Sequence, residues 1–429
     1  MKDSSLPEGE LGWARLSPVL VIHLCSTLGF SIALPFLIFL VEDLGGTSWT
    51  YGLLGATYSA AQMIGAPILG RWSDRVGRRT VLLVSQGGTA VAWILFLVAT
   101  LIPRDSLGTF GGATITAPLV LIFLARLLDG LTAGNISVAN AYVADITQSA
   151  KRARQIAFGR MGMAASLGFT LGPALSGLLG SWSDGYTGPI LAAIAVSCSG
   201  IALCLTLLEP GSRCPEGPPA EAAVGRVIGQ EHRRCDRPPS RASAELFADP
   251  VARLFLATTF LIFLAFNIYY AAFPVHATRA IGWSTVEMGL FYSLMSGAMF
   301  AVQGPLLQYA SSRFGSKALF GGGVVGLMAA FTIFPVATTV MAFAGGAFFA
   351  LGNGISWATF QARTAGVAPE HEQGALQGAL SSAGSLASIL GLSIGGWIYP
   401  SAGGTLFLGS AALFAVVLLL TPRLFPASD

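Results

Sequence analysis

Apolar residues in this chain form long, almost unbroken runs, unlike the half-apolar patterns of soluble helices and strands. Twelve of these runs are long enough to cross the hydrocarbon core of a bilayer as helices. The runs cover approximately residues 17–41, 50–69, 80–102, 116–143, 155–180, 188–208, 252–275, 287–310, 318–338, 340–363, 375–398 and 403–421. One run could be a buried core helix, but twelve in 429 residues predict an all-α integral membrane protein with twelve transmembrane helices.

A polar segment at 209–250 interrupts this pattern. Its prolines, its mixed charges and its weak apolar periodicity predict an irregular linker on the cytoplasmic side. The linker divides the runs six and six. We therefore expect an N-terminal six-helix bundle over residues 1–208 and a C-terminal six-helix bundle over residues 251–429.

The two halves also repeat in sequence. Residues 66–79, APILGRWSDRVGRR, align without gaps to residues 304–317, GPLLQYASSRFGSK. Two six-helix halves in the same orientation predict a pseudo-twofold axis along the membrane normal, with a binding site between the halves.

The distribution of charge orients the chain in the membrane. Charged residues make up 10% of the sequence and hydrophobic residues 53%, and the mean hydropathy is +0.68. Lysine and arginine gather near both termini and in every second loop, whereas the loops on the other side hold just Arg104 and Arg279. By the positive-inside rule we expect a multi-pass protein of the cell (inner) membrane with both termini in the cytoplasm.

Residues 70–79, GRWSDRVGRR, form a dense charged loop between two uncharged runs. They resemble the signature loop of the major facilitator superfamily, G-x-x-x-D-R-x-G-R-R. Gly70 and Gly77 are expected to allow a tight turn and close helix approach. The resemblance implies a cytoplasmic latch between the halves in which Arg78 reaches Asp145; a loop that only anchors the topology is the alternative. The expected gate residues are Gly70, Asp74, Arg75, Gly77, Arg78, Arg79 and Asp145.

The fifth run contains regularly spaced small residues. It resembles the antiporter motif of the same superfamily, G-x8-G-x3-G-P-x2-G-G, with Ser176 in place of one glycine. Packing of small residues would produce the same spacing, so the implied proton-coupled drug export follows from the resemblance alone. Together with RLLDGLTAGNISVANAYVADIT in the fourth run, it makes the chain most similar to the tetracycline-exporter group. The motif residues are Gly159, Gly168, Gly172, Pro173 and Gly177.

The fourth run contains an acid and a base far from either of its ends, Asp129 and Arg126. A charge at mid-bilayer is costly unless it faces a cavity or a partner. At about 100° per residue, both residues fall on one side of this helix together with Ser137 and Asn140. We expect Asp129 to bind the coupled proton beside Arg126; an ion pair that only holds the helix is the alternative.

The first run departs from the tetracycline-exporter pattern. That group typically has an aspartate nine residues before the first proline of this run, and here the position is Ser26. His23 is a further titratable group in the run, and histidine changes charge near neutral pH. His23 is therefore a candidate proton relay, with an ordinary packed or cavity-lining histidine as the alternative.

Aromatic and amide side chains within the later runs suit a flat, largely apolar organic molecule with few polar anchors. In membrane helices such aromatic residues also serve packing. The candidate residues of the substrate cavity are Ser137, Asn140, Asn267, Tyr270, Gln303, Asn353, Trp357 and Gln361.

These patterns predict a major facilitator fold that works by alternating access as a proton-coupled exporter of a small organic compound. A facilitator or importer on the same fold is the alternative, and the direction of transport separates the two. A receptor or membrane enzyme would need a clustered nucleophile, a metal set or a soluble catalytic domain, and the sequence shows none. We expect no enzyme activity, no cofactor and no metal. The expected partners are a small-molecule substrate, protons and the lipid bilayer, without nucleic acid, and we expect a monomer.

Overall fold

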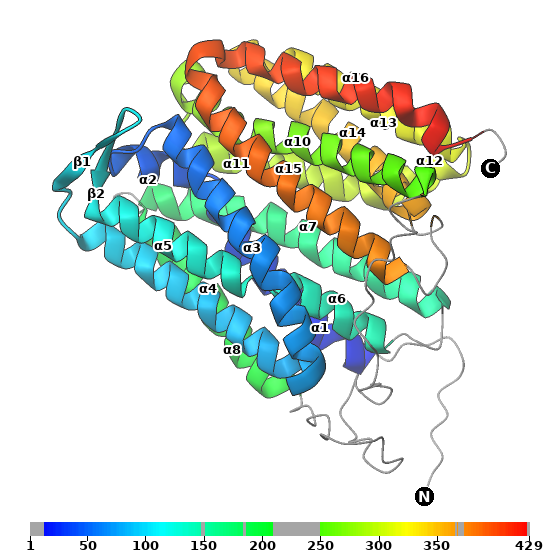
Figure 1. Cartoon of the computed structure of the whole chain (residues 1–429), viewed down its shortest axis with the longest axis horizontal. Coiled ribbons are helices and arrows are strands. Elements are labelled where there is room, and N and C mark those ends of the chain that lie inside the picture. Colours follow the sequence, from blue (N-terminus) through cyan, green and yellow to red (C-terminus); the bar gives the residue numbers. More distant parts are fainter. Residues whose placement is uncertain are drawn as a thin grey trace, which may run out of the picture.

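The structure is a computed structural model that describes residues 13–146, 151–182, 186–208, 249–364, 367 and 373–426. Its long helices form two groups that lie side by side, one in blue to green and one in green to red (Figure 1). We call them the first half and the second half. Most of the predicted linker, residues 209–248, lies outside the described residues, so the predicted domain boundaries stay a prediction.

The first half contains eight helices and one hairpin among the described residues. The helices are α1 (Trp13–Ser31), α2 (Leu37–Asp43), α3 (Ser48–Val76), α4 (Arg78–Leu101), α5 (Ala117–Thr132), α6 (Asn135–Ile146), α7 (Lys151–Trp182) and α8 (Thr187–Leu207). The hairpin consists of strands β1 (Ser106–Phe110) and β2 (Ala113–Thr116), which pair antiparallel.

The second half begins with α10 (Pro250–His276), which continues into the π-helical turn η1 (Ala277–Ile281). The remaining elements are α11 (Thr285–Ala301), η2 (Val302–Leu306), α12 (Leu307–Ser311), α13 (Ser316–Ile333), α14 (Thr339–Thr364), α15 (Gln373–Ala402), η3 (Gly403–Thr405) and α16 (Leu406–Leu424).

The predicted membrane spans correspond to these helices. Among the described residues, nine helical stretches are long and apolar enough to cross a membrane, and one of them, Leu376–Leu424, contains both α15 and α16. The shorter apolar helix Leu16–Ser31 and the long helix α3 account for the other two predicted spans. α3 is less apolar than the helices around it because it carries glycine, polar residues and the charged residues of the loop at its end.

Two predicted elements differ from the structure. The first run, 17–41, is two helices rather than one, because the chain turns at Ile32–Phe36. Pro35 lies in this turn, and a proline there removes a backbone donor and clashes with the preceding helical turn. The predicted loop at 103–115 contains the β-hairpin.

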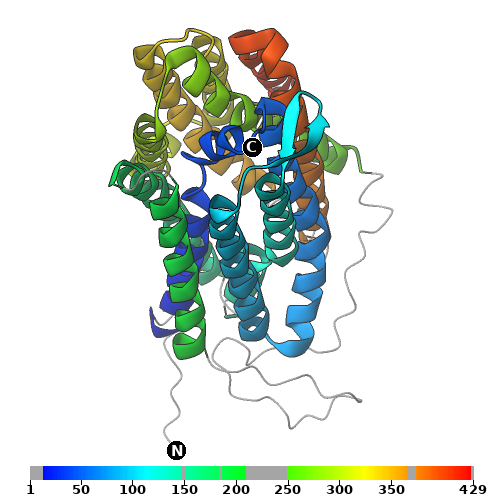
Figure 2. The ribbon, with the colours of Figure 1, turned by 90° about the vertical axis from the view of Figure 1, so that its left-hand side faces the viewer.

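The hairpin marks one end of the molecule. The amide of Thr114 donates to the carbonyl oxygen of Gly45 (2.9 Å), and the rings of Phe110 and Trp49 lie 5.7 Å apart, so the hairpin packs on the connection between α2 and α3. Figure 2, viewed from this side, shows the hairpin in front of the helices. We call this the hairpin end, and the opposite end, which carries residues 70–79, the arginine end.

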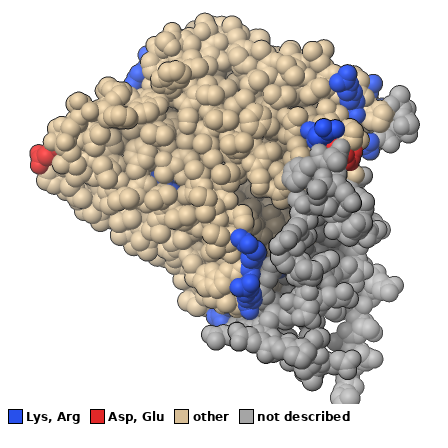
Figure 3. Space-filling model, viewed as in Figure 1, with Lys and Arg blue, Asp and Glu red and all other residues tan. Residues whose placement is uncertain are grey.

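The surface agrees with a membrane-spanning body. Figure 3 shows one face on which the long middle of the molecule is almost free of charged side chains. On that face, lysine and arginine gather mainly toward the end opposite the hairpin. Many large apolar side chains are exposed along the helices, including Leu101, Trp397 and Leu419. An apolar exterior of this kind is stable in lipid rather than in water.

Candidate functional site

The two halves touch through glycines at the hairpin end. A Cβ on Gly52 of α3 would lie 2.3 Å from the carbonyl oxygen of Leu392 and 3.0 Å from Cα of Gly396, both in α15. A Cβ on Gly289 of α11 would lie 2.6 Å from the carbonyl oxygen of Pro173 in α7. Both spaces are too small for a side chain. The backbones of the two halves are therefore in direct contact at this end.

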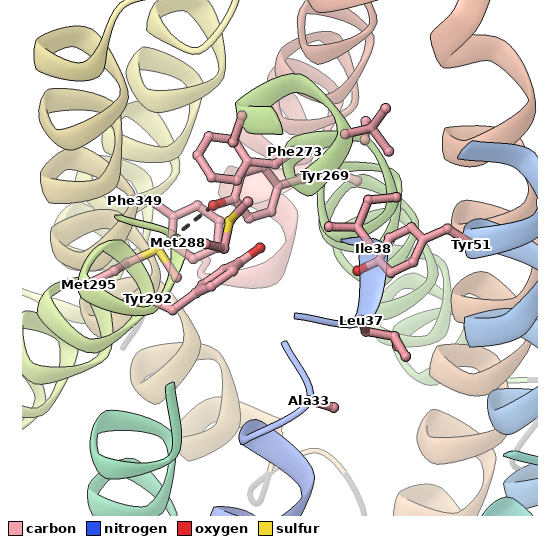
Figure 4. Close-up of a cluster of buried hydrophobic side chains, with 14 of the residues drawn as sticks. Ala33, Leu37, Ile38, Tyr51, Tyr269, Phe273, Met288, Tyr292, Met295 and Phe349 are labelled. Atoms are coloured by element: carbon pink, nitrogen blue, oxygen red, sulfur yellow. Dashed lines mark hydrogen bonds between the residues drawn. The ribbon is translucent and has the colours of Figure 1, made fainter. Parts of the chain in front are cut away.

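An ion pair and a shared apolar cluster also join the two halves at the hairpin end. Arg279 of η1 donates from Nε (3.0 Å) and Nη2 (2.6 Å) to Oε1 of Glu42 in α2. Figure 4 shows apolar residues of α2 and α3 beside buried rings and methionines of α10, α11 and α14. The buried core that contains them is continuous across both halves, whereas a second core cluster, which includes Leu16, Val81 and Val138, belongs to the first half alone.

The charged loop at the arginine end is a sharp connection between α3 and α4. Gly77 joins the helices with φ of 98°, a conformation that favours glycine. Gly70 lies inside α3, and among the described residues a Cβ there would meet no atom within 4 Å, so the expected close approach at Gly70 is wrong there. Arg75 is exposed on the last turn of α3.

The two final arginines of this loop point to different partners. Arg78 is buried and donates from Nη1 to Oγ of Ser73. Arg79 donates to the backbone carbonyl oxygens of Cys204 (3.2 Å) and Leu205 (2.8 Å) at the end of α8. A cation at the carboxyl end of a helix is favoured by the helix dipole. The side chains of Asp74 and Asp145 lie outside the described residues, so the predicted contact of Arg78 with Asp145 stays a prediction.

The buried charges of the fourth run form a caged pair. Nη1 of Arg126 lies 3.3 Å from Oδ2 of Asp129, and Oγ1 of Thr89 in α4 donates to Oδ1 of Asp129 (2.8 Å). The guanidinium of Arg126 also lies over three aromatic rings, with ring centroids at 5.0 to 5.9 Å. Those rings belong to Tyr58, Trp93 and Phe96. The expected pair is thus present, inside the first half between α3, α4 and α5.

The fourth run is not one continuous helix. α5 ends at Thr132 and α6 begins at Asn135, and the intervening Ala133 has ψ of 53°. Arg126 and Asp129 are buried, whereas Ser137 is exposed and Asn140 is half-buried, and their common polar side stays a prediction.

His23 is buried in α1, and within the described part of the chain its Nδ1 has no hydrogen-bond partner. One turn further along α1, Oγ of Ser26 accepts from Nε2 of Gln86 in α4 (3.0 Å). Neither Gln86 nor Thr89 was a sequence-based candidate. The presence of a glutamine or threonine in an apolar run does not predict which helix its side chain will contact.

The glycines of the fifth run divide between two neighbours. A Cβ on Gly172 of α7 would lie 2.9 Å from the carbonyl oxygen of Leu28 in α1, and Gly168 also faces α1, where Ser31 donates to its carbonyl oxygen (2.9 Å). Gly177 faces α11 of the second half, as does the carbonyl of Pro173. A Cβ on Gly159 would meet none of the described residues within 4 Å. α7 therefore packs closely on both halves at once.

Asn267 of α10 is the expected cavity residue with the clearest polar contacts. It donates from Nδ2 to Oγ of Ser388 in α15 (2.9 Å) and to the carbonyl oxygen of Phe263 (2.8 Å). Ser388 and Phe263 line a cavity of about 180 Å³ between α3, α10 and α15. Trp357 packs edge-on against Phe263, with centroids 5.6 Å apart.

The other expected cavity residues are dispersed. Gln303 lines a separate cavity of about 570 Å³ at the arginine end, formed by η2, α12, α13 and α14. Nδ2 of Asn353 lies 3.7 Å from Sδ of Met299, and Tyr270 packs against Tyr269. Gln361 is exposed. The structure therefore does not bring all the predicted residues into one site.

Comparison with known proteins decides the family. The profile of the Major Facilitator Superfamily matches residues 19–308 and 255–429. The chain belongs to the Major Facilitator Superfamily. This membership and the helical fold confirm the predicted class and fold. As a member of this superfamily, the chain is a multi-pass membrane transporter.

Individual relatives give the same answer. Tetracycline resistance protein class D of Salmonella ordonez is 26% identical over 94% of this chain and 94% of its own length. The class C protein of Escherichia coli is 29% identical over 91% of this chain and 92% of its own length. The crystal structure of the human organic anion transporter MFSD10 (TETRAN) covers 95% of this chain and 99% of its own, with a TM-score of 0.66 and 23% identity, and supports the fold. The predicted similarity to tetracycline exporters is confirmed.

Proposed function

We propose that this transporter exports a small, largely apolar organic compound in exchange for protons, as a monomer in the cell (inner) membrane. In the proposal, the arginine end and both termini face the cytoplasm, as the positive-inside rule predicts. The substrate class comes from the tetracycline resistance proteins to which the chain is similar. Residues 209–250 act as the tether between the halves.

The observation that carries the proposal is the buried pair of Arg126 and Asp129. A carboxylate in the membrane interior is costly and is usually retained for ion or proton movement. In this protein the carboxylate has an arginine, a hydroxyl and aromatic rings around it. Its helix α5 packs on α3, and α3 packs on α15 of the second half. Protonation of Asp129 would break its pairing with Arg126, and this change would alter how α5 packs against α3 and α4.

The contact between the halves supports alternating access. Glycine contacts and an ion pair join the halves at the hairpin end. A transporter open toward the arginine end would have this arrangement, and opening toward the other side would require these contacts to separate. The two buried clusters agree with this view, because the cluster at the arginine end of the first half includes no residue of the second half.

The test uses inside-out vesicles with tetracycline as the probe. Asp129→Asn should abolish accumulation driven by a pH gradient and leave downhill exchange of tetracycline measurable. One pH unit supplies about 1.4 kcal/mol and 100 mV about 2.3 kcal/mol per charge, together roughly a 500-fold gradient per proton. The wild-type protein in vesicles without a gradient is the control.

The alternative is a facilitator or importer in which the buried pair only holds the helices. The same similarity and fold permit this function, because the superfamily fold does not fix direction. In that case the double change Arg126→Ala with Asp129→Ala should restore much of the activity that either single change removes. Uphill pumping by this double variant, or full pH-gradient dependence of Asp129→Asn, would overturn Asp129 as the coupling residue.

A further inference from the structure

His276 is a buried titratable residue at the hairpin end, and the proposed transport mechanism does not use it. It is the last residue of α10, and its exposed fraction is 2%. Its Nδ1 lies 2.9 Å from the hydroxyl oxygen of Tyr399 in α15. Its Nε2 is buried and has no hydrogen-bond partner within the described part of the chain. Because protonation adds a second N–H to the imidazole ring, this surrounding cannot suit both protonation states equally.

Several elements of the second half enclose the ring of His276. The ring of Phe407 in α16 packs edge-on against it, with centroids 5.3 Å apart. A Cβ on Gly404 of η3 would lie 3.1 Å from Cε1 of His276 and 3.1 Å from Cα of Pro335, which follows α13. The backbone of Phe334 also lies close to the ring. His276 therefore joins the ends of α10, α13, α15 and α16 at one point, and its ring has little room to move.

The charges around this junction do not favour a proton on His276. Arg279, three residues further along the chain in η1, acts electrostatically on the hydroxyl of Tyr399, and its carboxylate partner is Glu42 of α2. Among the residues that the structure describes, no carboxylate acts on the His276 ring itself. A proton there would place a second cation in an apolar enclosure without a counter-charge. An unpaired buried charge of this kind is costly.

The two elements that His276 connects both contact the first half. Tyr399 lies one turn after Gly396 on α15, and a Cβ on Gly396 would lie 2.6 Å from the carbonyl oxygen of Ser48 in α3. On the other side, α10 continues directly into η1, from which Arg279 reaches the first half. The contact between His276 and Tyr399 therefore fixes the positions of both elements relative to each other.

We propose that His276 is a positioning residue for closure of the hairpin end, and that its protonation loosens this closure. When the ring is neutral with its proton on Nε2, Nδ1 accepts from the hydroxyl of Tyr399 and holds α10 to α15. When the ring is protonated, Nδ1 can no longer accept, and water reaches the buried charge only if the ends of α10 and α15 separate. Closure is then complete at high pH and weakens as the pH falls through the titration of His276. In the orientation of the proposed function, on which this last step rests, acid outside the cell favours opening toward the outside.

The experiment measures opening of the hairpin end in purified full-length protein, without substrate and without a gradient. Ser48→Cys is the reporter, because Ser48 is fully buried where α3 meets α15. Ser106→Cys, on the exposed strand β1, is introduced into the same protein as a reference that cancels the pH dependence of thiol reactivity. Alkylation by N-ethylmaleimide at the two positions is followed by peptide mass spectrometry between pH 5 and 8, the range in which histidine changes charge. We expect the rate at position 48, relative to that at position 106, to rise several-fold as the pH falls.

Three further variants separate titration of His276 from packing. His276→Asn keeps an acceptor near the position of Nδ1 but cannot be protonated, so its relative rate should stay low at every pH. Tyr399→Phe removes the hydroxyl that pairs with His276, so its relative rate should already be raised at pH 8. Thr278→Val is the matched control, because the hydroxyl of Thr278 donates to the carbonyl oxygens of Pro274 (2.7 Å) and Val275 (3.0 Å) in the same helix. This control should follow the wild-type protein.

The outcomes separate this proposal from the proposed function, because the readout requires no export. A pH response that is present with the native His276 and absent from His276→Asn supports the proposal even if the protein does not pump tetracycline. A response that persists in His276→Asn overturns it and assigns the pH dependence to another group, first of all Glu42. A relative rate that does not change with pH in the protein with the native His276 also overturns it. If His276→Asn does not fold, Tyr399→Phe decides, and a relative rate at pH 8 equal to that with the native Tyr399 would contradict the proposal.

Discussion

At the scale of single residues, the cage around Arg126 and Asp129 is the most specific arrangement in this protein. The aromatic rings of Tyr58, Trp93 and Phe96 lie close to the guanidinium, and a desolvated cation over an aromatic face gains about 2 kcal/mol. These contacts hold Arg126 without satisfying Asp129. The carboxylate therefore depends on Arg126 and Thr89, and a change at either residue acts directly on it.

Thr89 is the residue through which this dependence can be tested. Thr89→Val removes the donor to Oδ1 of Asp129 while it keeps the shape of the side chain. We expect a 2- to 10-fold loss of gradient-driven transport, the usual effect of one hydrogen bond, and a changed dependence on pH. Thr89→Ser keeps the hydroxyl and should stay near wild type. Equal losses in both variants, measured in vesicles across a pH series, would instead indicate a packing effect.

A second residue-scale prediction concerns the charged loop. Arg78→Ala should lower transport at least tenfold with near-normal membrane expression, because Arg78 is buried and bonded to Ser73. Arg71→Ala is the matched control, since Arg71 is exposed and donates to the carbonyl oxygen of Pro67 in its own helix. Drug-resistance growth and immunoblots of the membrane fraction measure both. Similar activity of the two variants would assign the loop to topology alone.

At this scale, the sequence predicted those functional residues whose types are rare in apolar runs. Arg126 and Asp129 could be predicted because charged residues deep in an apolar run have few explanations. Thr89 and Ser388 could not, because serine and threonine occur in membrane helices for packing and bond to their own backbone. Only the contacts between helices give these hydroxyls a role.

At the scale of elements, the interruptions of the helices were the least predictable features. An apolar run predicts that a segment crosses the membrane, but it does not predict where the helix bends. The break between α5 and α6 depends on Ala133 and on Gly134, where a Cβ would lie 2.7 Å from the side chain of Leu69. Such a constraint comes from a neighbouring helix and is absent from the local sequence.

α7 provides the test at this scale. Gly172→Ala places a Cβ against the backbone of α1, and overpacking of this kind costs about 1–3 kcal/mol. We therefore expect a clearly lower thermal stability in detergent. Gly159→Ala, within the same motif, adds its Cβ to open space and should be tolerated. If the two variants were equally destabilised, the motif would be important for a reason other than close packing.

At the scale of the whole molecule, closure of the hairpin end combines two kinds of contact with different strengths. The Glu42–Arg279 pair is partly exposed on both sides, and pairs of this kind contribute about 0–1 kcal/mol. The backbone contact at Gly52 allows no side chain at all. The second contact should therefore control whether this end can close.

The prediction compares one variant of each kind. Arg279→Ala should change the transport rate less than about fivefold. Gly52→Val should reduce it by more than tenfold, because the valine would separate α3 from α15. Gly87→Val, where a Cβ meets no atom within 4 Å, is the control for the substitution itself. A larger loss from Arg279→Ala than from Gly52→Val would show that charge rather than backbone contact governs closure.

The aromatic cluster of the second half distinguishes it from the first half. Tyr269, Phe273, Phe334 and Phe349 lie in a continuous aromatic cluster, with neighbouring centroids 5.1 Å apart, whereas the buried Arg126–Asp129 pair lies in the first half. We infer that the two halves have specialised in different ways. In the proposed function, the second half moves as a stiff body, and the first half contains the buried Arg126–Asp129 pair that responds to protons. In a transporter of this kind, we expect a damaging substitution in the second half to lower the thermal stability. A damaging substitution in the first half should instead weaken the coupling of transport to the proton gradient.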